Sequence, residues 1–462
     1  MIDPELAQRV IEEALRRGGD FAELFAEERL ATSVGVDDGR VEGLLDYASR
    51  GVGIRVVVGE TTGFAHTQDL SPASLLDAAR VASSIARSVG AGNVADVSGP
   101  GPGTGGAVME PGRKRKMVEL ARALDDEARS GADTGAIAQV ATQVATEHRS
   151  ILVANSEGRF VGDARARTKA VVHVVATGDG GAQSGREVLA LSVDLDTFLA
   201  DSEPLETARR ARTRALVKVQ AKDAPAGIWP VVLARGSGGI LFHEACGHGL
   251  EADHIAKGVS VFAGRLGERL ASPLVTLVDD PTMAGAWGAY ALDDEGNSAR
   301  PTVLIRDGVL VDYLWDRRSA RKLGAEHHGN GRRQDYRSLP MVRMTNTFVA
   351  PGESDPEEIV AQTDRGIYVA ALSGGQVNTA TGDFVFGTQE AYLIEHGRIS
   401  APLRDTQLIG NGPAVLAAID AVGNDLALSS GTCGKLGQGV PVGTGQPTLR
   451  VAAMTLGGTR RG

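Results

Sequence analysis

The stretch of residues 238–251 reads GGILFHEACGHGLE and places two histidines, a glutamate and a cysteine within six residues, directly after an apolar run. A neutral imidazole is a good zinc ligand, and a neighbouring carboxylate that does not bind the metal can take a proton from metal-bound water. This combination indicates a zinc-dependent hydrolase. The spacing alone leaves open a second interpretation, in which both histidines belong to an ordinary helix and face the core or the solvent.

His243 and His248 are five residues apart, which on an ideal helix separates their directions by about 140°. In the common His-Glu-x-x-His pattern the two ligands are four residues apart and point about 40° from each other. Both imidazoles can therefore face one ion only if the helix ends or bulges between them. Gly247 lies there, and we expect it to permit the break because glycine tolerates unusual backbone at low steric cost.

The chain has two cysteines, Cys246 and Cys433. Residues 430–443 read SGTCGKLGQGVPVG, and this glycine content predicts a loop with tight turns that presents the Cys433 side chain toward a site. Cys246 lies three residues after His243 and could reach a metal on the same helix face. We expect it instead to be a small buried hydrophobic residue, as free cysteines commonly are.

The chain resembles the TldD/PmbA family of metalloproteases, and in particular its TldD-type subunit, over nearly its whole length. In chain order, the resembling blocks are residues 51–55 with 62–65, 238–251, 331–333, 339–347, 374–377 with 381–384, and 431–435. Six blocks in the same order argue against chance similarity. The resemblance implies that His243, His248 and Cys433 bind one zinc ion per chain and that Glu244 is the general base.

The resemblance further implies a zinc-dependent peptidase that hydrolyses unfolded or unstructured polypeptides or precursor peptides. Glu244 would take a proton from zinc-activated water and return it to the leaving amine. One alternative is a catalytically silent subunit that binds zinc and serves in assembly or peptide binding. A redox protein using Cys246 and Cys433 is a more distant alternative, because the chain has no Cys-x-x-Cys and a zinc-bound thiolate cannot form a reversible disulfide.

Two further sets of residues are expected near the site. The resemblance places residues 374–383 beside it, where glycines would let a substrate backbone approach closely. The predicted substrate-binding residues of this block are Gly374, Gly375, Gln376 and Asp383. Glu251, Asp253 and His254 follow the histidine motif and are predicted to orient the ligand imidazoles, the alternative being that they are solvated loop residues.

The composition and the net charge limit which classes of binding partner are expected. The net charge is −10 and no long basic run occurs, so we expect no nucleic-acid ligand. The chain has few cysteines, no secretory signal and no apolar run approaching 18 residues, which predicts a cytoplasmic protein without a membrane association. The resemblance implies a heterodimer with a PmbA/TldE-type subunit, which typically lacks the metal motif; a homodimer is the second expectation.

The order of periodic segments predicts an α+β fold of two domains. A mixed α/β domain, residues 1–222, would provide scaffold and subunit contacts, and a glycine-rich, strand-rich domain, residues 223–462, would carry the metal site. The 60 glycines favour many turns and short strands. Helices are predicted for residues 4–17, 72–88, 113–129 and 204–218, and strands within 21–68 and at 136–146, 150–153 and 168–177.

Overall fold

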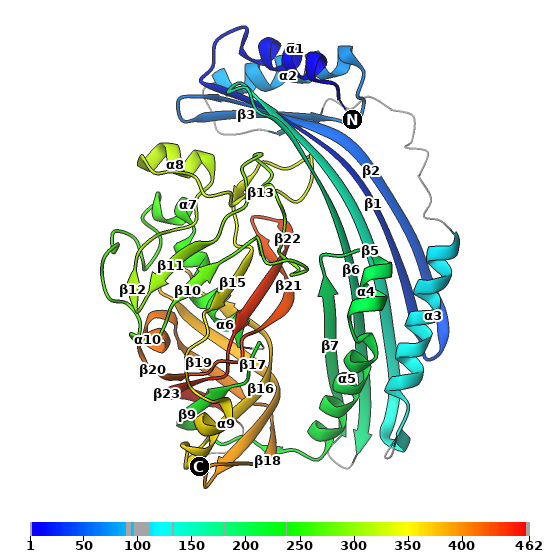
Figure 1. Cartoon of the computed structure of the whole chain (residues 1–462), viewed down its shortest axis with the longest axis vertical. Coiled ribbons are helices and arrows are strands. Elements are labelled where there is room, and N and C mark those ends of the chain that lie inside the picture. The colour runs from blue at the N-terminus through cyan, green and yellow to red at the C-terminus, as the bar shows by residue number, and fades with distance from the viewer. Residues whose placement is uncertain are drawn as a thin grey trace.

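The computed structural model describes residues 2–88, 94–96, 111–131, 134–178, 181–236 and 238–458. These residues form two strand-rich parts that lie side by side (Figure 1). The first part is a long curved sheet with helices on its outer side, and the second is a body of shorter strands and helices against the sheet's other side.

The first part is built on a seven-stranded sheet in the order β4-β3-β2-β1-β5-β6-β7. Its first helix begins where the sequence predicts, because Asp3 Oδ1 accepts a hydrogen bond from Leu6 N at 2.9 Å and Pro4 opens the first turn. The elements are α1 (Pro4–Leu15), β1 (Phe21–Asp37), β2 (Arg40–Val58), β3 (Thr61–Thr67), α2 (Pro72–Arg87), β4 (Val94–Asp96), α3 (Pro111–Ala128), η1 (Thr134–Ala136), β5 (Ile137–Asn155), β6 (Phe160–Gly178), β7 (Gly181–Leu191), α4 (Leu195–Asp201) and α5 (Pro204–Val219).

Strand alternation gives this sheet one apolar face and one charged face, since successive side chains point to opposite sides. Val34 and Val144 are directly opposite each other on β1 and β5, and they pack in the core formed with α3 and α5. The α1 and α2 helices cover the same face at the other end of the sheet. On the opposite face, Glu147 of β5 lies across from Ala31 and Arg167. The charged face is the one turned toward the second part.

Buried ion pairs join the charged face to the second part. Arg55 Nη2 donates to Glu23 and to Glu295, each at 2.8 Å. Arg165 Nη1 donates to Asp294 at 3.0 Å. Burial raises the pKa of Asp294, but the arginines beside it outweigh burial and hold that pKa below its usual range. Because buried charges persist only when they are paired, these contacts determine how the two parts meet.

The second part contains a six-stranded sheet, in the order β12-β11-β10-β15-β22-β21, and a ring of strands. In the ring β16, β9, β23, β19 and β17 pair successively, and β17 also pairs with β16. The elements are β8 (Lys222–Asp223), β9 (Gly227–Leu233), α6 (Gly239–Ala245), η2 (Gly247–Leu250), α7 (Ala252–Ile255), β10 (Leu277–Asp279), β11 (Thr302–Arg306), β12 (Val309–Leu310), α8 (Arg317–Leu323), β13 (Gly331–Arg332), β14 (Met341–Val342), β15 (Asn346–Val349), α9 (Pro356–Ala361), β16 (Arg365–Val377), β17 (Asp383–Glu395), β18 (Arg398–Arg404), β19 (Gln407–Asn411), α10 (Gly412–Ala417), β20 (Ile419–Val422), β21 (Ala427–Lys435), β22 (Gln438–Gln446) and β23 (Leu449–Gly457).

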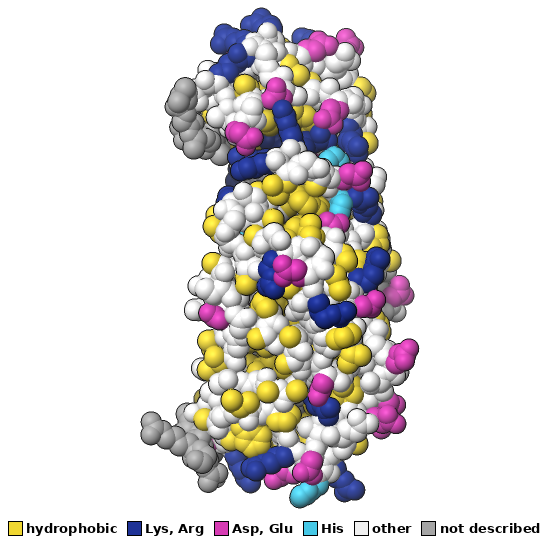
Figure 2. Space-filling view, turned by 90° about the vertical axis from the view of Figure 1, so that its left-hand side faces the viewer, with side chains coloured by type: hydrophobic (Ala, Val, Ile, Leu, Met, Phe, Trp, Pro, Cys, Tyr) yellow, Lys and Arg dark blue, Asp and Glu magenta, His cyan; other side chains and the backbone are white. Residues whose placement is uncertain are grey.

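The outer face of the second part carries mixed charges. Figure 2 shows acidic and basic side chains interspersed with hydrophobic ones, and a band of Lys and Arg toward the α1–α2 end. Arg317, Arg318, Arg321 and Lys322 of α8 line a cavity between that helix and the first sheet. Within the described residues, no helix has both the length and the apolar character needed to cross a membrane.

The predicted α+β class is confirmed, and so are the four predicted helices to within a few residues. The predicted β segments at 136–146 and 150–153 are confirmed to within a residue, and both belong to one strand, β5, which runs unbroken through residues 147–149. The charged side chains in between are paired across the sheet, as Glu147 is with Arg29. Strand β7 and helix α4 were not predicted. Division of the chain at residue 222 stays a prediction; β8, at that point, pairs with β18 of the second part.

Candidate metal centre

The first histidine of the motif, His243, is carried by α6, which packs tightly between the two sheets of the second part. A Cβ atom on Gly239 would lie 2.2 Å from the backbone nitrogen of Gly445 on β22. Only glycine therefore lets the helix lie this close to the strand. Leu241 and Phe242 anchor the helix in the core, and His243 is buried.

The helix ends between the two histidines, as their spacing requires. The break lies at Cys246, which has φ −125° and ψ −50°, and is followed by the 3₁₀ turn η2 with His248. Gly247 is needed for a different reason from the one predicted. A Cβ atom there would lie 2.1 Å from Met344 Sδ, so glycine allows close packing of the turn rather than an unusual backbone conformation.

The third candidate ligand, Cys433, lies on a strand rather than in the predicted loop. It is on β21 opposite Val440 of β22, and the turn of this hairpin contains Leu436 and Gly437 with φ of 48° and 78°. The tight turn predicted from the glycines is present, but it follows Cys433. The hairpin brings the Cys433 side chain to the motif, 185 residues away in sequence.

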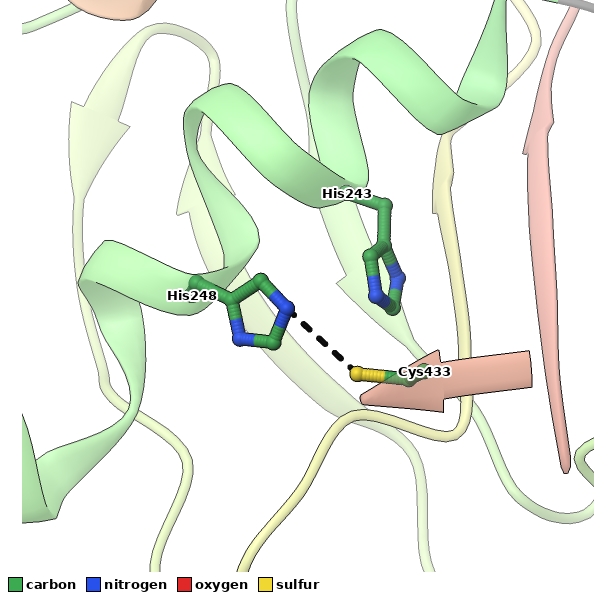
Figure 3. Close-up of side chains that lie close together, drawn as sticks. All are labelled: His243, His248 and Cys433. Carbon is green, nitrogen blue, oxygen red and sulfur yellow. Dashed lines mark hydrogen bonds between the residues drawn. The ribbon is translucent and has the colours of Figure 1, made fainter. Parts of the chain in front are cut away.

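His243, His248 and Cys433 converge in the folded chain (Figure 3). All three are buried, and one donor atom from each lies within 4.8 Å of the others. His248 Nε2 is 3.4 Å from Cys433 Sγ, and the centres of the two imidazole rings are 5.1 Å apart. These residues come from α6, η2 and β21, so the cluster exists only in the folded second part.

The electrostatics of the cluster favour a thiolate. Burial favours the neutral thiol, but His243 and His248 outweigh burial and lower the pKa of Cys433 to about 4. Burial lowers the pKa of His248, whereas Glu251 and Cys433 raise it well above its usual value. A thiolate is the form of cysteine that binds metals.

The cluster also fits a metal ion by an independent observation. Both ring nitrogens of His243 are buried and have no hydrogen-bond partner in the part of the chain that the structure describes. Buried polar atoms are nearly always satisfied, and an exception calls for a missing partner. Two imidazoles and one thiolate form a donor set that suits zinc and leaves a fourth position for water or substrate.

A buried hydrogen-bond network supports His248. Glu251 Oε2 accepts from His248 Nδ1 at 2.9 Å, and Lys435 Nζ donates to the same oxygen at 2.9 Å. Lys435 Nζ also donates to Asp253 at 2.7 Å. His254 Nδ1 is 3.1 Å from the backbone oxygen of His248. Glu251, Asp253 and His254 are also close enough to one another to bind a metal ion. However, Lys435 Nζ donates hydrogen bonds to both carboxylates, so an ammonium group already balances their charge.

Glu244 faces a groove next to the cluster. Its side chain is 28% exposed, and its Oε2 lies 3.7 Å from His248 Nε2. The groove has a volume of about 350 Å³ and is lined by His243 and Glu244, by residues 429–432 of β21, by residues 186–188 of β7 and by residues 371–374 of β16. The candidate base is therefore open to a substrate, whereas the candidate ligands are buried.

Of the predicted substrate-binding residues, only Gly374 lines this groove. A Cβ atom on Gly375 would meet the Phe386 ring at 2.2 Å, so this glycine serves packing within the strand ring. Gln376 is exposed further along β16. Asp383 accepts hydrogen bonds from Thr381 and Asn411 in a turn. Cys246 lies in the hydrophobic core, where burial raises the pKa of its thiol above the usual range.

Several residues of the site were not predicted. Lys435 belongs to the block at 431–435, and its position two residues after Cys433 was a usable signal. Arg186 and Arg214 of the first part also line the groove. Arg214 Nε donates to Glu390 of β17 at 3.1 Å. No local sequence pattern relates these arginines to the histidine motif, because they reach the groove only when the first part packs against the second.

Comparison with known proteins gives matches to one family over both parts of the chain. Residues 22–86, 113–219 and 226–458 match the PmbA/TldA metallopeptidase domain 1, central domain and C-terminal domain. The chain is 38% identical to the metalloprotease TldD homolog of Haemophilus influenzae, covering 96% of this chain and 94% of that protein. It is 34% identical to the zinc metalloprotease TldD homolog of Saccharolobus solfataricus, over 53% of this chain and 55% of that protein.

The fold matches as well. The crystal structure of TldE from Thermococcus kodakarensis superposes with a TM-score of 0.76 at 20% identity and covers 98% of this chain and 99% of that one. Taken with the domain matches over both parts and the nearly full-length relative, this shows that the chain belongs to the PmbA/TldA metallopeptidase family, which the sequence resembles.

Proposed function

We propose that the protein is a zinc-dependent metallopeptidase in which His243, His248 and Cys433 bind one zinc ion and Glu244 is the general base. The observation that carries this proposal is the buried cluster of three N and S donors within 4.8 Å of one another, with a partly exposed carboxylate beside it. The names of the two relatives, metalloprotease and zinc metalloprotease, support the same activity.

The chemistry that zinc supplies when bound is polarisation of the scissile carbonyl and a lowered pKa of the attacking water. The protein's own groups do the rest. Glu244 Oε2, 3.7 Å from His248 Nε2, accepts the proton of the water and returns it to the leaving nitrogen. Glu251 holds the imidazole of His248 by its Nδ1, so that Nε2 is directed toward the cluster. Lys435 compensates the buried charge of Glu251.

The proposed substrates are unfolded or unstructured polypeptides, including precursor peptides. β21 is the terminal strand of its sheet, and its residues 429–432 line the groove. An edge strand can pair with an extended peptide through backbone hydrogen bonds, independently of the side chains. In a folded chain most extended segments are already paired, which favours unstructured substrates.

The test uses four proteins: wild type, Glu244→Gln, Cys433→Ser and the control Glu119→Gln. Glu119 lies on α3 with a side chain that is 67% exposed. Each protein is incubated with a mixture of unstructured peptides, and the products are identified by mass spectrometry while bound zinc is measured. We expect wild type and Glu119→Gln to cleave, Glu244→Gln to retain zinc without cleaving, and Cys433→Ser to lose both. Absence of cleavage by zinc-loaded wild type, also with a TldE-type subunit added, would favour the catalytically silent subunit.

We further propose that the protein works as a heterodimer with a TldE-type subunit, and otherwise as a homodimer. Support comes from the shared fold with TldE. Co-expression of the two chains followed by light scattering tests it, since a heterodimer has one copy of each chain and a homodimer excludes the TldE-type chain. A cytoplasmic location is part of the proposal, in keeping with two free cysteines.

A further inference from the structure

A second cavity lies close to the groove, along the charged face of the first sheet. It has a volume of about 400 Å³ and lies between β1, β5 and β6 on one side and the β21–β22 hairpin on the other. Thr432, next to Cys433, lines both this cavity and the groove. A polypeptide that occupies the groove along β21 therefore lies next to the second cavity.

Arg167 of β6 is among the residues that line this cavity, and part of its guanidinium group is buried and unsatisfied. The residue is 2% exposed, and its Nε and Nη2 atoms have no hydrogen-bond partner among the residues that the structure describes. Its Nη1 donates to Glu147 at 3.4 Å. Nε and Nη2 form one edge of the guanidinium plane, and two parallel N–H groups on one edge match the two oxygens of a carboxylate. A buried donor pair without a partner points to a missing ligand.

The charges around the cavity are not balanced. Arg29, Arg167 and Lys169 line it with Glu147, which gives three cations and one carboxylate. Glu147 is already paired with Arg29, and Lys169 makes no ion pair with any described residue. Burial lowers the pKa of Arg167 to about 9, although Glu147 raises it. The cavity is therefore short of negative charge.

Part of the cavity wall is apolar and aromatic. Tyr47 and Trp287 lie on opposite parts of the molecule, and Pro441 of the hairpin completes the wall. The Arg167 Cζ atom is 5.9 Å from the centre of the Trp287 ring. Aromatic walls hold the guanidinium in place and exclude water, which strengthens an ion pair formed inside.

We propose that this cavity is a subsite that binds a carboxylate of the polypeptide substrate through the guanidinium group of Arg167, with Lys169 adding positive charge. The carboxylate comes from an acidic side chain or from the C-terminus of the peptide. The proposal rests on the proposed function for the nature of the ligand. It makes Arg167 a specificity-determining residue, supplied by the first part of the chain to a site whose metal ligands belong to the second.

The test measures binding separately from cleavage, in the Glu244→Gln background. Four versions of one fluorescent, unstructured peptide are titrated: with a single internal glutamate or glutamine, each with a free or amidated C-terminus. Anisotropy gives the dissociation constants. We expect one carboxylate to strengthen binding about tenfold or more, as a charge-assisted bidentate contact does, and the peptide pair that shows this effect identifies its source.

The variants Arg167→Met, Lys169→Met and the control Arg115→Met complete the test. Arg115 lies on α3 with a side chain that is 78% exposed. We expect Arg167→Met to abolish the preference for a carboxylate, Lys169→Met to reduce it, and Arg115→Met to leave it unchanged. Thermal unfolding and zinc content verify that Arg167→Met is folded. If this variant is not folded, the test uses Lys169→Met, whose side chain is partly exposed, together with the salt dependence of peptide binding.

Equal binding of all four peptides would overturn the proposal, and so would a carboxylate preference that persists in folded Arg167→Met. Cleavage by wild type, measured in parallel, separates this outcome from a failure of the proposed function. Cleavage without carboxylate preference refutes only the subsite. Carboxylate-dependent binding without cleavage supports the proposed subsite and refutes the proposed peptidase activity.

Discussion

Replacement of Glu251 by glutamine tests whether zinc binding depends on a residue that does not belong to the ligand cluster. Glu251 is fully buried, and its Oε2 accepts from both His248 Nδ1 and Lys435 Nζ at 2.9 Å. Its other oxygen has no partner within the described part of the chain. Glutamine keeps the shape of the side chain but removes the charge that holds the His248 ring.

The magnitude follows from these contacts. Loss of a hydrogen-bonded partner of a ligand imidazole weakens metal binding about 10–100-fold. Both charged contacts of Glu251 pass through a single oxygen, but Lys435 keeps its bond to Asp253 at 2.7 Å. We therefore expect the middle of this range, about 30-fold or about 2 kcal/mol in zinc affinity, and a smaller change in the stability of the metal-free protein.

Zinc affinity is measured by competition with a chromophoric chelator at neutral pH, and the metal-free proteins are compared by thermal unfolding. Glu268→Gln is the matched control, because the Glu268 side chain is 52% exposed and pairs with Arg265 at 2.8 Å. Unchanged zinc affinity in folded Glu251→Gln would refute the role assigned to this network. A loss of stability in the metal-free protein as large as the loss in zinc binding would make Glu251 a general structural residue instead.

Three other outcomes are expected. Removal of zinc by a chelator should lower the unfolding temperature, with recovery on adding zinc, and Cys433→Ser should show neither change, because only the assembled cluster links the metal to folding. Gly239→Ala should destabilise the protein by about 2 kcal/mol or more in denaturant unfolding, since its Cβ would lie 2.2 Å from a backbone nitrogen, whereas Gly112→Ala, whose Cβ would have no atom of the described residues within 4 Å, should not. The pKa of Asp294 is lower in the folded than in the unfolded chain, so its stabilisation is complete above its unfolded pKa of about 3.9 and is lost as pH falls through its folded value; Asp294→Asn should flatten the acid limb of the pH–stability curve, and an unchanged limb would contradict this.

Much of the first part could be predicted from local patterns. Caps such as Asp3 with Pro4 mark a helix start within a few residues, because the hydrogen bonds that cap a helix are made by its immediate neighbours in sequence. The β segments predicted on either side of residues 147–149 belong to one strand, in which Glu147 pairs with Arg29 and Arg167 on adjacent strands. Such pairing depends on neighbours that are distant in sequence.

The sequence by itself determined the chemistry available at the candidate metal site. The residue types and spacing of His243, Glu244 and His248, together with the family resemblance, were sufficient to nominate the ligands and the base, since imidazole, thiolate and carboxylate have the same intrinsic chemistry in any fold. The need for a helix break between the histidines also follows from helix geometry alone.

Only the tertiary structure decided which groups surround that site. Lys435 meets Glu251 across 184 residues of sequence, and Arg167 joins the second cavity because the charged face of the first sheet lies against the β21–β22 hairpin. Burial likewise decides that the guanidinium of Arg167 lacks a full set of partners among the described residues. These properties arise from long-range packing and desolvation, which local sequence patterns do not encode.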